Sequence, residues 1–398
     1  MKASDQAIWV KGEVALHHIS DKKTKWGNEH HGSLPTPRFQ HASCVANGKL
    51  FIIGGTNGSD ILNDFHVFNP LTFTWTEYVA HPSRNKVQDG GRARHTVTFM
   101  KDLNALFLFG GVCRSGIADQ TLYVLDLSKD LSLREGTFAW RKHSDQIGQE
   151  VPTPRFAHCA VAVCNHLYVF GGERLNKKLS RTMFMYDPIK KEWSRALQHQ
   201  SAKSMAPPAG KDYRMLVIPE HRVNSGTRHL VVLGTNLKFI YLVPIERGTG
   251  QPISWDSIGA IGAIPGAIKS IVNNQALTPV RRQYAACVVN SSEPGRRSGG
   301  RRSNQKNGNN EEECEIIIFG GIVHNPKSAL TDDVHSLTIR VEEGKAEWIS
   351  VTQRGRAVPS ARIGHSFSFL EYKSPQTGLI NRQLCMFGGT DSDGELCF

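Results

Sequence analysis

The strongest pattern in the chain is a short apolar run that ends in a glycine doublet. It reads LFIIGG, LFLFGG, LYVFGG, IIIFGG and LCMFGG, at residues 50–55, 106–111, 167–172, 316–321 and 384–389. A weaker copy, LVVLGT at 230–235, lies in the one gap that is too long. Runs this short, rich in β-branched and aromatic residues and stopped by glycine, predict β-strands rather than helices.

Each run belongs to a longer repeated unit. Before the run come Arg-x-x-His or Arg-x-x-Tyr and then a strand of small residues, except in the fourth unit, which offers Lys211 and Arg214 instead. After it come an alternating strand and a strand that carries a tryptophan. The tryptophans are Trp75, Trp140, Trp193, Trp255 and Trp348. Each unit is therefore predicted to hold four short strands, and the chain to hold six units.

Units of about 50 residues with a glycine doublet and a late tryptophan resemble the kelch repeat. The resemblance covers nearly the whole chain, and kelch repeats form β-propellers, in which four-stranded blades surround a central channel. It implies an all-β, six-bladed kelch propeller that occupies residues 1–398 as one domain. The blades are expected at about 38–78, 92–142, 155–195, 211–257, 281–350 and 362–398, the last of them completed by 13–28.

The sixth unit lacks its third and fourth strands, because only TDSDGELCF follows its glycine doublet. Near the N-terminus, LHHISDKKTKW at 16–26 aligns with FHVFNPLTFTW at 65–75. We expect the N-terminal strands to complete the last blade, which closes the ring and leaves no open edge strand. In the fifth blade, the Gly-, Ser- and Asn-rich insert at 291–313 is predicted to be a disordered loop.

The repeated arginine and the loop after the glycine doublet are predicted to share one face, since strand two returns to the face where strand one begins. A guanidinium suits carboxylate or phosphate, because it donates two parallel hydrogen bonds. The resemblance implies that such arginines grip acidic or carboxylate-ending peptides. In the alternative interpretation, each arginine packs on a neighbouring blade and bonds its backbone. The partner-binding candidates are Arg38, Arg92, Arg155, Lys211, Arg214, Arg281 and Arg362, with Arg114, Arg174 and Lys177 from the loops.

Charge and composition narrow the chemistry further. The net charge of +12 suggests an acidic partner, which is a protein, a nucleic acid or anionic lipid. The eight cysteines are scattered without zinc-type spacing, so we expect reduced thiols. Equivalent histidines on separate blades cannot meet on one metal ion, and no cofactor is expected. The chain lacks an apolar run long enough to span a membrane, and its start lacks a signal peptide.

The sequence therefore predicts a protein-interaction module rather than an enzyme, acting as an adaptor or scaffold in the cytoplasm or nucleus. It is expected to bind an acidic or carboxylate-bearing segment of another protein on the arginine-rich face. The alternatives are a kelch-type enzyme with a metal or sugar substrate and an RNA-binding propeller. The first needs metal ligands or a paired acid and base, and the second needs basic residues interleaved with aromatics. We find neither pattern in the sequence.

Overall fold

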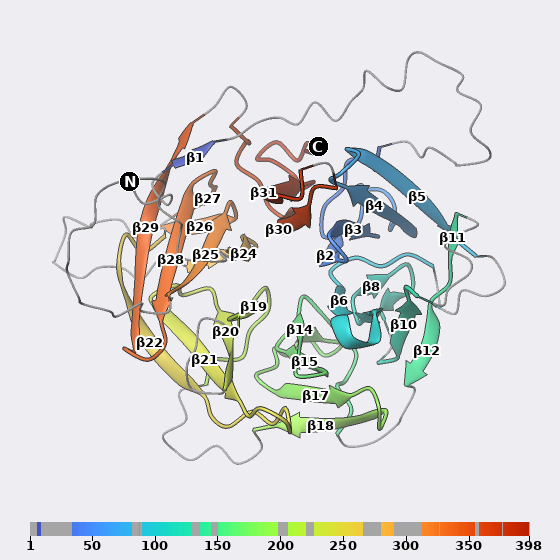
Figure 1. Ribbon diagram of the computed structural model, residues 1–398, viewed down its shortest axis with the longest axis horizontal. Coiled ribbons are helices and arrows are strands. Elements are labelled where there is room, and N and C mark those ends of the chain that lie inside the picture. The colour runs from blue at the N-terminus through green and yellow to red at the C-terminus, as the bar shows by residue number, and fades with distance from the viewer. Residues whose placement is uncertain are drawn as a thin grey trace.

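The computed structural model describes residues 6–8, 34–81, 87, 90–118, 120–128, 136–144, 150–197, 206–219, 227–265, 280–289, 313–325, 327–354, 358–375 and 377–397. Their strands form antiparallel sheets arranged in a ring (Figure 1). We number the repeated units 1 to 6 in chain order. Within the described residues, units 1 to 5 each have four strands in the order in which they occur along the chain, and unit 6 has two.

The first three units are built from twelve strands. Unit 1 contains β2 (Ala42–Ala46), β3 (Lys49–Ile53), β4 (Asp64–Asn69) and β5 (Thr74–Ala80). Unit 2 contains β6 (Thr96–Met100), β7 (Ala105–Phe109), β10 (Leu122–Asp126) and β12 (Arg141–Ser144), with a 3-10 turn, η3 (Lys101–Leu103). Unit 3 contains β14 (Cys159–Val163), β15 (His166–Phe170), β17 (Met183–Asp187) and β18 (Glu192–Ala196).

The remaining units complete the ring. Unit 4 contains β19 (Arg214–Val217), β20 (Arg228–Leu233), β21 (Phe239–Ile245) and β22 (Asp256–Gly262). Unit 5 contains β24 (Ala285–Val289), β25 (Glu313–Phe319), β28 (Val334–Arg340) and β29 (Lys345–Arg354). Unit 6 contains β30 (Ser366–Lys373) and β31 (Ile380–Phe387).

Short strands lie outside this pattern. On one face are β8 (Val112–Cys113), β9 (Gly116–Ile117), β13 (Arg155–Phe156), β16 (Glu173–Arg174), β23 (Val280–Arg282), β26 (Ile322–Asn325) and β27 (Lys327–Leu330). Two others cover outer edges: β11 (Thr137–Phe138) pairs parallel to β5, and β1 (Gln6–Ile8) pairs parallel to β29, which also pairs with β22. Such pairing satisfies backbone groups that an exposed edge strand would leave open.

The apolar core lies in the seams between neighbouring units. One buried cluster joins units 1 and 2, others join units 2 and 3, 3 and 4, and 4 and 5, and smaller clusters join units 5 and 6. The seam between units 6 and 1 packs Leu370 and Phe387 against Leu50, Ile52 and Phe68. The second strands of units 1 to 4, β3, β7, β15 and β20, are buried on both faces because they lie between two seams, whereas β31 of unit 6 is mostly exposed or half-buried. The last and first units of the chain therefore pack together (Figure 1).

The glycine doublets connect each unit to the next. In units 1, 2 and 5 the N–H of the second glycine donates to the carbonyl of the repeated arginine in the following unit, at 2.8 Å from Gly55 to Arg92 and 2.9 Å from Gly111 to Arg155. In unit 3 the Gly172 N–H donates instead to the carbonyl of Gly210, at 2.8 Å. The last doublet bonds back to the first unit, from Gly389 to Arg38 at 2.8 Å. Unit 4 has Thr235 instead of the second glycine, and there the direction reverses, with the Arg281 N–H donating to its carbonyl at 2.9 Å.

This close approach explains why the first residue of the doublet is glycine. Gly54 has a φ of +58°, and a Cβ added there would lie 2.5 Å from the Arg92 carbonyl oxygen. A Cβ at Gly320 would lie 2.8 Å from the Arg362 carbonyl oxygen. Any side chain would both strain the backbone and push the next unit away.

The all-β propeller that the sequence predicted is confirmed. The predicted completion of unit 6 by residues 13–28 lies outside the described residues. Most of the predicted loop at 291–313 also lies outside them, and its last residue, Glu313, begins β25.

Replacing Gly54 with alanine is expected to lower the free energy of unfolding by about 1–3 kcal/mol from backbone strain alone, with the clash at the Arg92 carbonyl adding to this. Urea titration measures the loss. The control is Gly259→Ala, because a Cβ at Gly259 meets no atom within 4 Å and needs no positive φ. Equal stability of the two variants would contradict the role of the doublet.

Candidate functional site

The repeated arginines and the segments after the glycine doublets lie on one face, as the sequence predicted. Isolated bridges join Phe39 to Thr56, Ala93 to Val112 and Ile363 to Thr390, and the pairs β13–β16 and β23–β26 do the same in units 3 and 5. We call this face the Gly-Gly rim. Its described residues are 38–41, 92–95, 155–158, 211–214, 281–284 and 362–365, together with 54–64, 110–118, 120–121, 171–182, 234–238, 320–325, 327–333 and 388–397.

Six residues with left-handed backbone line up around the rim, one from each unit. Each occupies the third position of the Arg-x-x-His motif or of its equivalent. The six residues are Gln40, Arg94, Ala157, Asp212, Gln283 and Gly364. Backbone hydrogen bonds of 2.8–3.0 Å link successive members, from the Asp212 N–H through Ala157, Arg94 and Gln40 to the carbonyl of Gly364. These bonds hold residues other than glycine in a conformation that is normally unfavourable. The rim is thus a defined frame for the side chains that it carries.

The five repeated arginines are buried in this frame. Their exposed fractions are 0% for Arg38 and Arg281, 1% for Arg155, 3% for Arg92 and 7% for Arg362. Each guanidinium donates to the carbonyl of the first glycine of its own unit, at 2.8–3.2 Å. Such burial leaves little surface for a partner. The geometry favours the alternative interpretation, in which each arginine bonds the backbone and holds it in place. The backbone that it bonds belongs to its own unit rather than to a neighbouring one.

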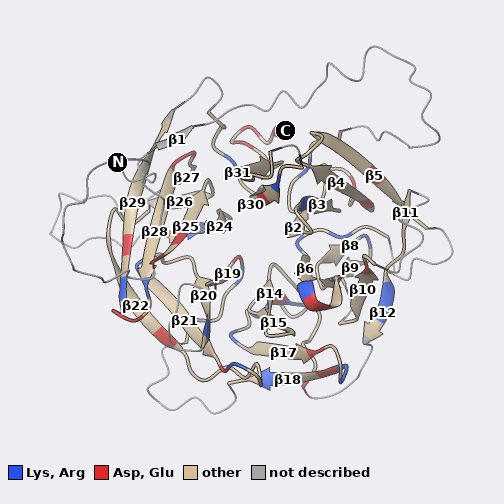
Figure 2. Ribbon diagram, in the orientation of Figure 1, with Lys and Arg blue, Asp and Glu red and all other residues tan. Residues whose placement is uncertain are grey.

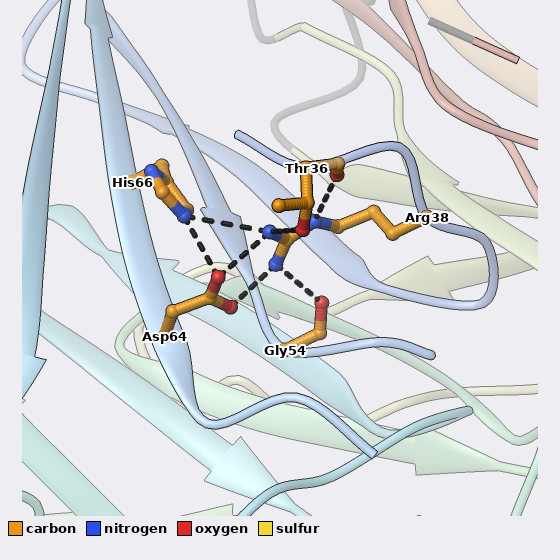
Figure 3. A network of polar contacts seen from close by, with 5 residues as sticks. All are labelled: Thr36, Arg38, Gly54, Asp64 and His66. Carbon is orange, nitrogen blue, oxygen red and sulfur yellow. Dashed lines mark hydrogen bonds and ion pairs between the residues drawn. The ribbon is translucent and has the colours of Figure 1, made fainter. Parts of the chain in front are cut away.

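Unit 1 shows how such a buried charge is neutralised (Figure 3). Arg38 forms a two-pronged ion pair with Asp64, and its Nη2 donates to Oδ2 at 2.7 Å. Thr36 accepts two further hydrogen bonds, and the His66 Nε2 lies 2.9 Å from the Asp64 Oδ2. Burial alone would raise the pKa of Asp64, but the hydrogen bonds from Arg38 and His66 outweigh it and hold the pKa well below its usual range.

The same positions carry different residues in other units. Unit 5 repeats the Asp-x-His arrangement, with the Arg281 Nη2 2.7 Å from the Asp333 Oδ1 and His335 beside them. In unit 3 the strand register gives Thr182 and Phe184 as the counterparts of Asp64 and His66, because Met183 pairs with Phe170 as Phe65 pairs with Ile53. Arg155 there lies over the Phe184 ring, with its Cζ 4.9 Å from the ring centroid.

The other sequence-predicted cations are more accessible. Lys211 pairs with Glu173, and Arg114 pairs with Asp60 at 3.1 Å on the surface. Lys177 is exposed, and Arg174 is half-buried and pairs across β13–β16 with Arg155. Arg214 is half-buried at the start of β19, with its Cζ 5.8 Å from the centroid of the Tyr284 ring. Partner binding by these residues stays a prediction.

Sequence reasoning missed two cations of the motif, Arg94 at the third position in unit 2 and Arg282 at the second position in unit 5. Arg94 is part of the left-handed ring, pairs with Asp212 at 3.2 Å and lies over Phe156, with its Cζ 4.8 Å from the ring centroid. Lys211 lies near the same ring, its Nζ 5.9 Å from the centroid. Arg282 is exposed next to the buried Arg281. The signal was a second arginine within the motif, as in Arg-Ala-Arg-His and Arg-Arg-Gln-Tyr.

Four histidines of the motif lie in the seams: His95, His158 and His365 are buried, and His41 is partly buried. His41 bonds Ser366 of unit 6 at 2.9 Å, and His158 bonds Thr96 of unit 2 at 2.8 Å. Burial, with a smaller contribution from the neighbouring arginine, lowers the pKa of His41 and of His95 to about 3. The pKa values of His158 and His365 are also lowered well below normal, chiefly by burial. These side chains are therefore neutral at physiological pH.

Within the described residues, one group of side chains has the spacing of metal ligands. Asp64, His66 and Glu77 have ligand atoms within 4.8 Å of one another. The Arg38 guanidinium already pairs with Asp64 and lies 3.4 Å from the His66 Nε2. A cation would have to displace this charge, so we interpret the group as part of the arginine network. Among the described residues, no helix is long and apolar enough to cross a membrane.

The sheet order and the rim define a β-propeller, and comparison with known proteins identifies its family. Residues 37–78 match the model of the Kelch motif, and residues 79–226 match that of the KLHDC2/KLHL20/DRC7 Kelch-repeats domain. Residues 37–226 thus carry kelch repeats, which supports a kelch-repeat family for this chain.

Curated relatives share parts of the chain. The human Rab9 effector protein with kelch motifs is 30% identical over 173 residues, which cover 41% of this chain and 42% of the relative. Kelch repeat-containing protein 2 of Saccharomyces cerevisiae is 32% identical over 168 residues, or 39% of this chain and 17% of the relative. Mouse Multiple epidermal growth factor-like domains protein 8 is 26% identical over 224 residues, or 51% of this chain and 8% of the relative. The match thus spans less than half the length of each relative.

Because the histidines of the motif have lowered pKa values in the folded protein, we expect the protein to lose stability in acid. Their folded pKa values lie below that of an unfolded histidine, about 6.5, so protons bind the unfolded chain first. The free energy of unfolding should be unaffected above about pH 7 and should fall between about pH 6 and pH 3, by about 1.4 kcal/mol per pH unit for each histidine.

Urea titrations from pH 7.5 to pH 5 test this slope. His95→Phe should flatten it, because the described part of the chain provides no hydrogen-bond partner for either ring nitrogen of His95. The control is His324→Phe on the exposed strand β26. An unchanged slope in His95→Phe would contradict the assignment.

Proposed function

We propose that this chain is a protein-interaction module that binds an acidic segment of a partner on the Gly-Gly rim. Kelch-repeat relatives point to an interaction module. The proposal assigns direct contact to the accessible cations of the rim and gives most of the buried arginines the task of holding those cations in place. An adaptor or scaffold without enzymatic activity, in the cytoplasm or nucleus, fits the eight cysteines, which form no disulfide among the described residues.

The uneven charge of the rim is the observation that carries the proposal. Apart from the five buried arginines, the described rim segments of units 2, 3 and 4 hold the cations Arg94, Arg114, Arg174, Lys177, Lys178, Arg181, Lys211, Arg214 and Lys238, against the acids Glu173 and Asp212. Those of units 5, 6 and 1 hold the acids Asp332, Asp333, Asp391, Asp393, Glu395, Asp60 and Asp64, against the cations Arg282 and Lys327. Figure 2 shows acidic positions along the loop between β31 and the C-terminus. An acidic segment is attracted to the first half and repelled by the second, which sets its position on the rim.

The chemistry of units 2 to 4 suits such a segment. Arg94 and Lys211 both approach Phe156, and each already has a carboxylate partner, in Asp212 and Glu173. Their side chains are 20% and 36% exposed, so a second carboxylate reaches them from solvent. Arginine and lysine next to an aromatic ring provide both charge and contact area.

Fluorescence anisotropy with a labelled octaglutamate peptide, amidated at its C-terminus, tests the proposal. The triple variant Arg94→Gln, Lys177→Gln, Lys211→Gln should bind about threefold to a hundredfold more weakly, because three exposed charge pairs at about 0.2–1 kcal/mol each sum to about 0.6–3 kcal/mol. The matched control, Arg141→Gln, Lys142→Gln, Lys190→Gln, removes the same charge from β12 and from the β17–β18 turn.

The control variant should bind within about twofold of the unmodified protein. Equal weakening of both variants would show that only net charge matters and would overturn the rim as the site. Tighter binding of a labelled oligouridine than of the peptide would instead favour the RNA-binding alternative.

A further inference from the structure

Unit 3 departs from the charge balance that units 1 and 5 share. In those two units the buried arginine faces an aspartate on strand three, through the pairs Arg38–Asp64 and Arg281–Asp333. Buried charges in proteins are normally paired in this way, because an isolated ion loses its hydration without compensation. In unit 3 the position of the aspartate is Thr182, which has no carboxylate.

Arg155 has hydrogen bonds but no opposite charge. It donates to the carbonyls of Thr153 and Gly171, at 3.0 and 2.9 Å, and to the hydroxyls of Thr153 and Ser180, at 3.3 and 3.4 Å. All of these acceptors are neutral. Among the described residues no carboxylate pairs with Arg155, although its side chain is as buried as those of its counterparts.

A second cation stands directly beside it. Arg174 is the cross-strand partner of Arg155 in the β13–β16 pair, and its Nε is buried without a hydrogen-bond partner. Burial, and to a smaller extent the charge of Arg174, lower the pKa of Arg155 to about 10. This shift is expected for two cations held close together where water has little access. Arg155 remains charged at neutral pH.

Solvent reaches the position that carries the aspartate in units 1 and 5 and Thr182 in unit 3. The side chain of Asp64 in unit 1 is 23% exposed and that of Asp333 in unit 5 is 37% exposed, although the arginines that they bind are completely buried. Thr182 is likewise only partly buried. A carboxylate brought by another molecule can therefore approach Arg155 along the path that Asp64 takes to Arg38.

We infer that Arg155 and Arg174 form a subsite for one carboxylate of a bound peptide, which takes the place that an aspartate of the chain fills in units 1 and 5. This deepens the proposed function and rests on it, since it names the point of the basic half of the rim where the partner's carboxylate is held most closely. The carboxylate comes from an acidic side chain or from a free C-terminus.

Supplying the carboxylate within the chain tests the subsite. Thr182→Asp should rebuild the ion pair of unit 1, raise the Tm of the unliganded protein and weaken octaglutamate binding at least about tenfold. Thr182→Asn has the same shape without the charge and should bind within about twofold of the unmodified protein. Ser59→Asp adds the same charge to an exposed site on the rim of unit 1 and controls for the general field.

A second variant leaves Arg155 and Thr182 in place. Arg174→Gln should weaken peptide binding at least about tenfold, as loss of a half-buried hydrogen bond between charged groups does, whereas Arg141→Gln on β12 should not. A labelled Gly-Ser octapeptide with a free C-terminus, compared with its amidated form, distinguishes a terminal carboxylate from a side-chain carboxylate.

The outcomes separate the two proposals. If the unmodified protein binds neither the octaglutamate nor the free-ended peptide, the proposed function itself fails. If it binds, but Thr182→Asp and Arg174→Gln bind as tightly as their controls, the rim binds acidic segments and the subsite is wrong. Selective loss in Thr182→Asp with retention in Thr182→Asn supports the subsite.

Discussion

The contact on which the whole molecule depends is the hydrogen bond from the second glycine of each doublet to the backbone of the next unit. It requires the first glycine to have positive φ and no Cβ, since the neighbouring carbonyl lies within 2.9 Å of where a Cβ would be. The same first glycine offers its carbonyl to the buried arginine. One dipeptide thus fixes the distance between units and the position of the arginine within each unit.

The charge of the rim follows from this constraint. Once five arginines are buried, each needs compensation, and the chain provides it unevenly. Asp64 and Asp333 neutralise two of them, whereas Arg155 has hydroxyl and carbonyl partners and a second arginine alongside. Together with the loop cations of units 2 to 4, this leaves one half of the rim basic. A scaffold whose frame is rigid can hold an unbalanced charge that a partner then neutralises.

Much of this architecture could be predicted from the sequence, because the doublets, tryptophans and arginines recur at regular positions and strand alternation assigns the arginines to one face. Whether those arginines contact a partner could not be predicted, since their burial depends on the approach of the next unit at Gly54 and its equivalents. The left-handed ring was also missed: Gln40, Arg94 and Asp212 share no side-chain chemistry, and only their backbone is equivalent. Asp-x-His in units 1 and 5 against Thr-x-Phe in unit 3 was visible in the sequence, but strand register is needed to align them.

Native-state hydrogen exchange tests the central claim, that a closed ring of inter-unit bonds holds the rim together. The amides of Gly55, Gly111 and Gly389 should exchange together, at the rate set by global unfolding, because each donates to a neighbouring unit. Gly389 is the decisive amide, since its bond to the Arg38 carbonyl joins the last unit to the first. Exchange of the Gly389 amide far faster than that of Gly111 would mean that the ring is open at this seam, and would contradict the account.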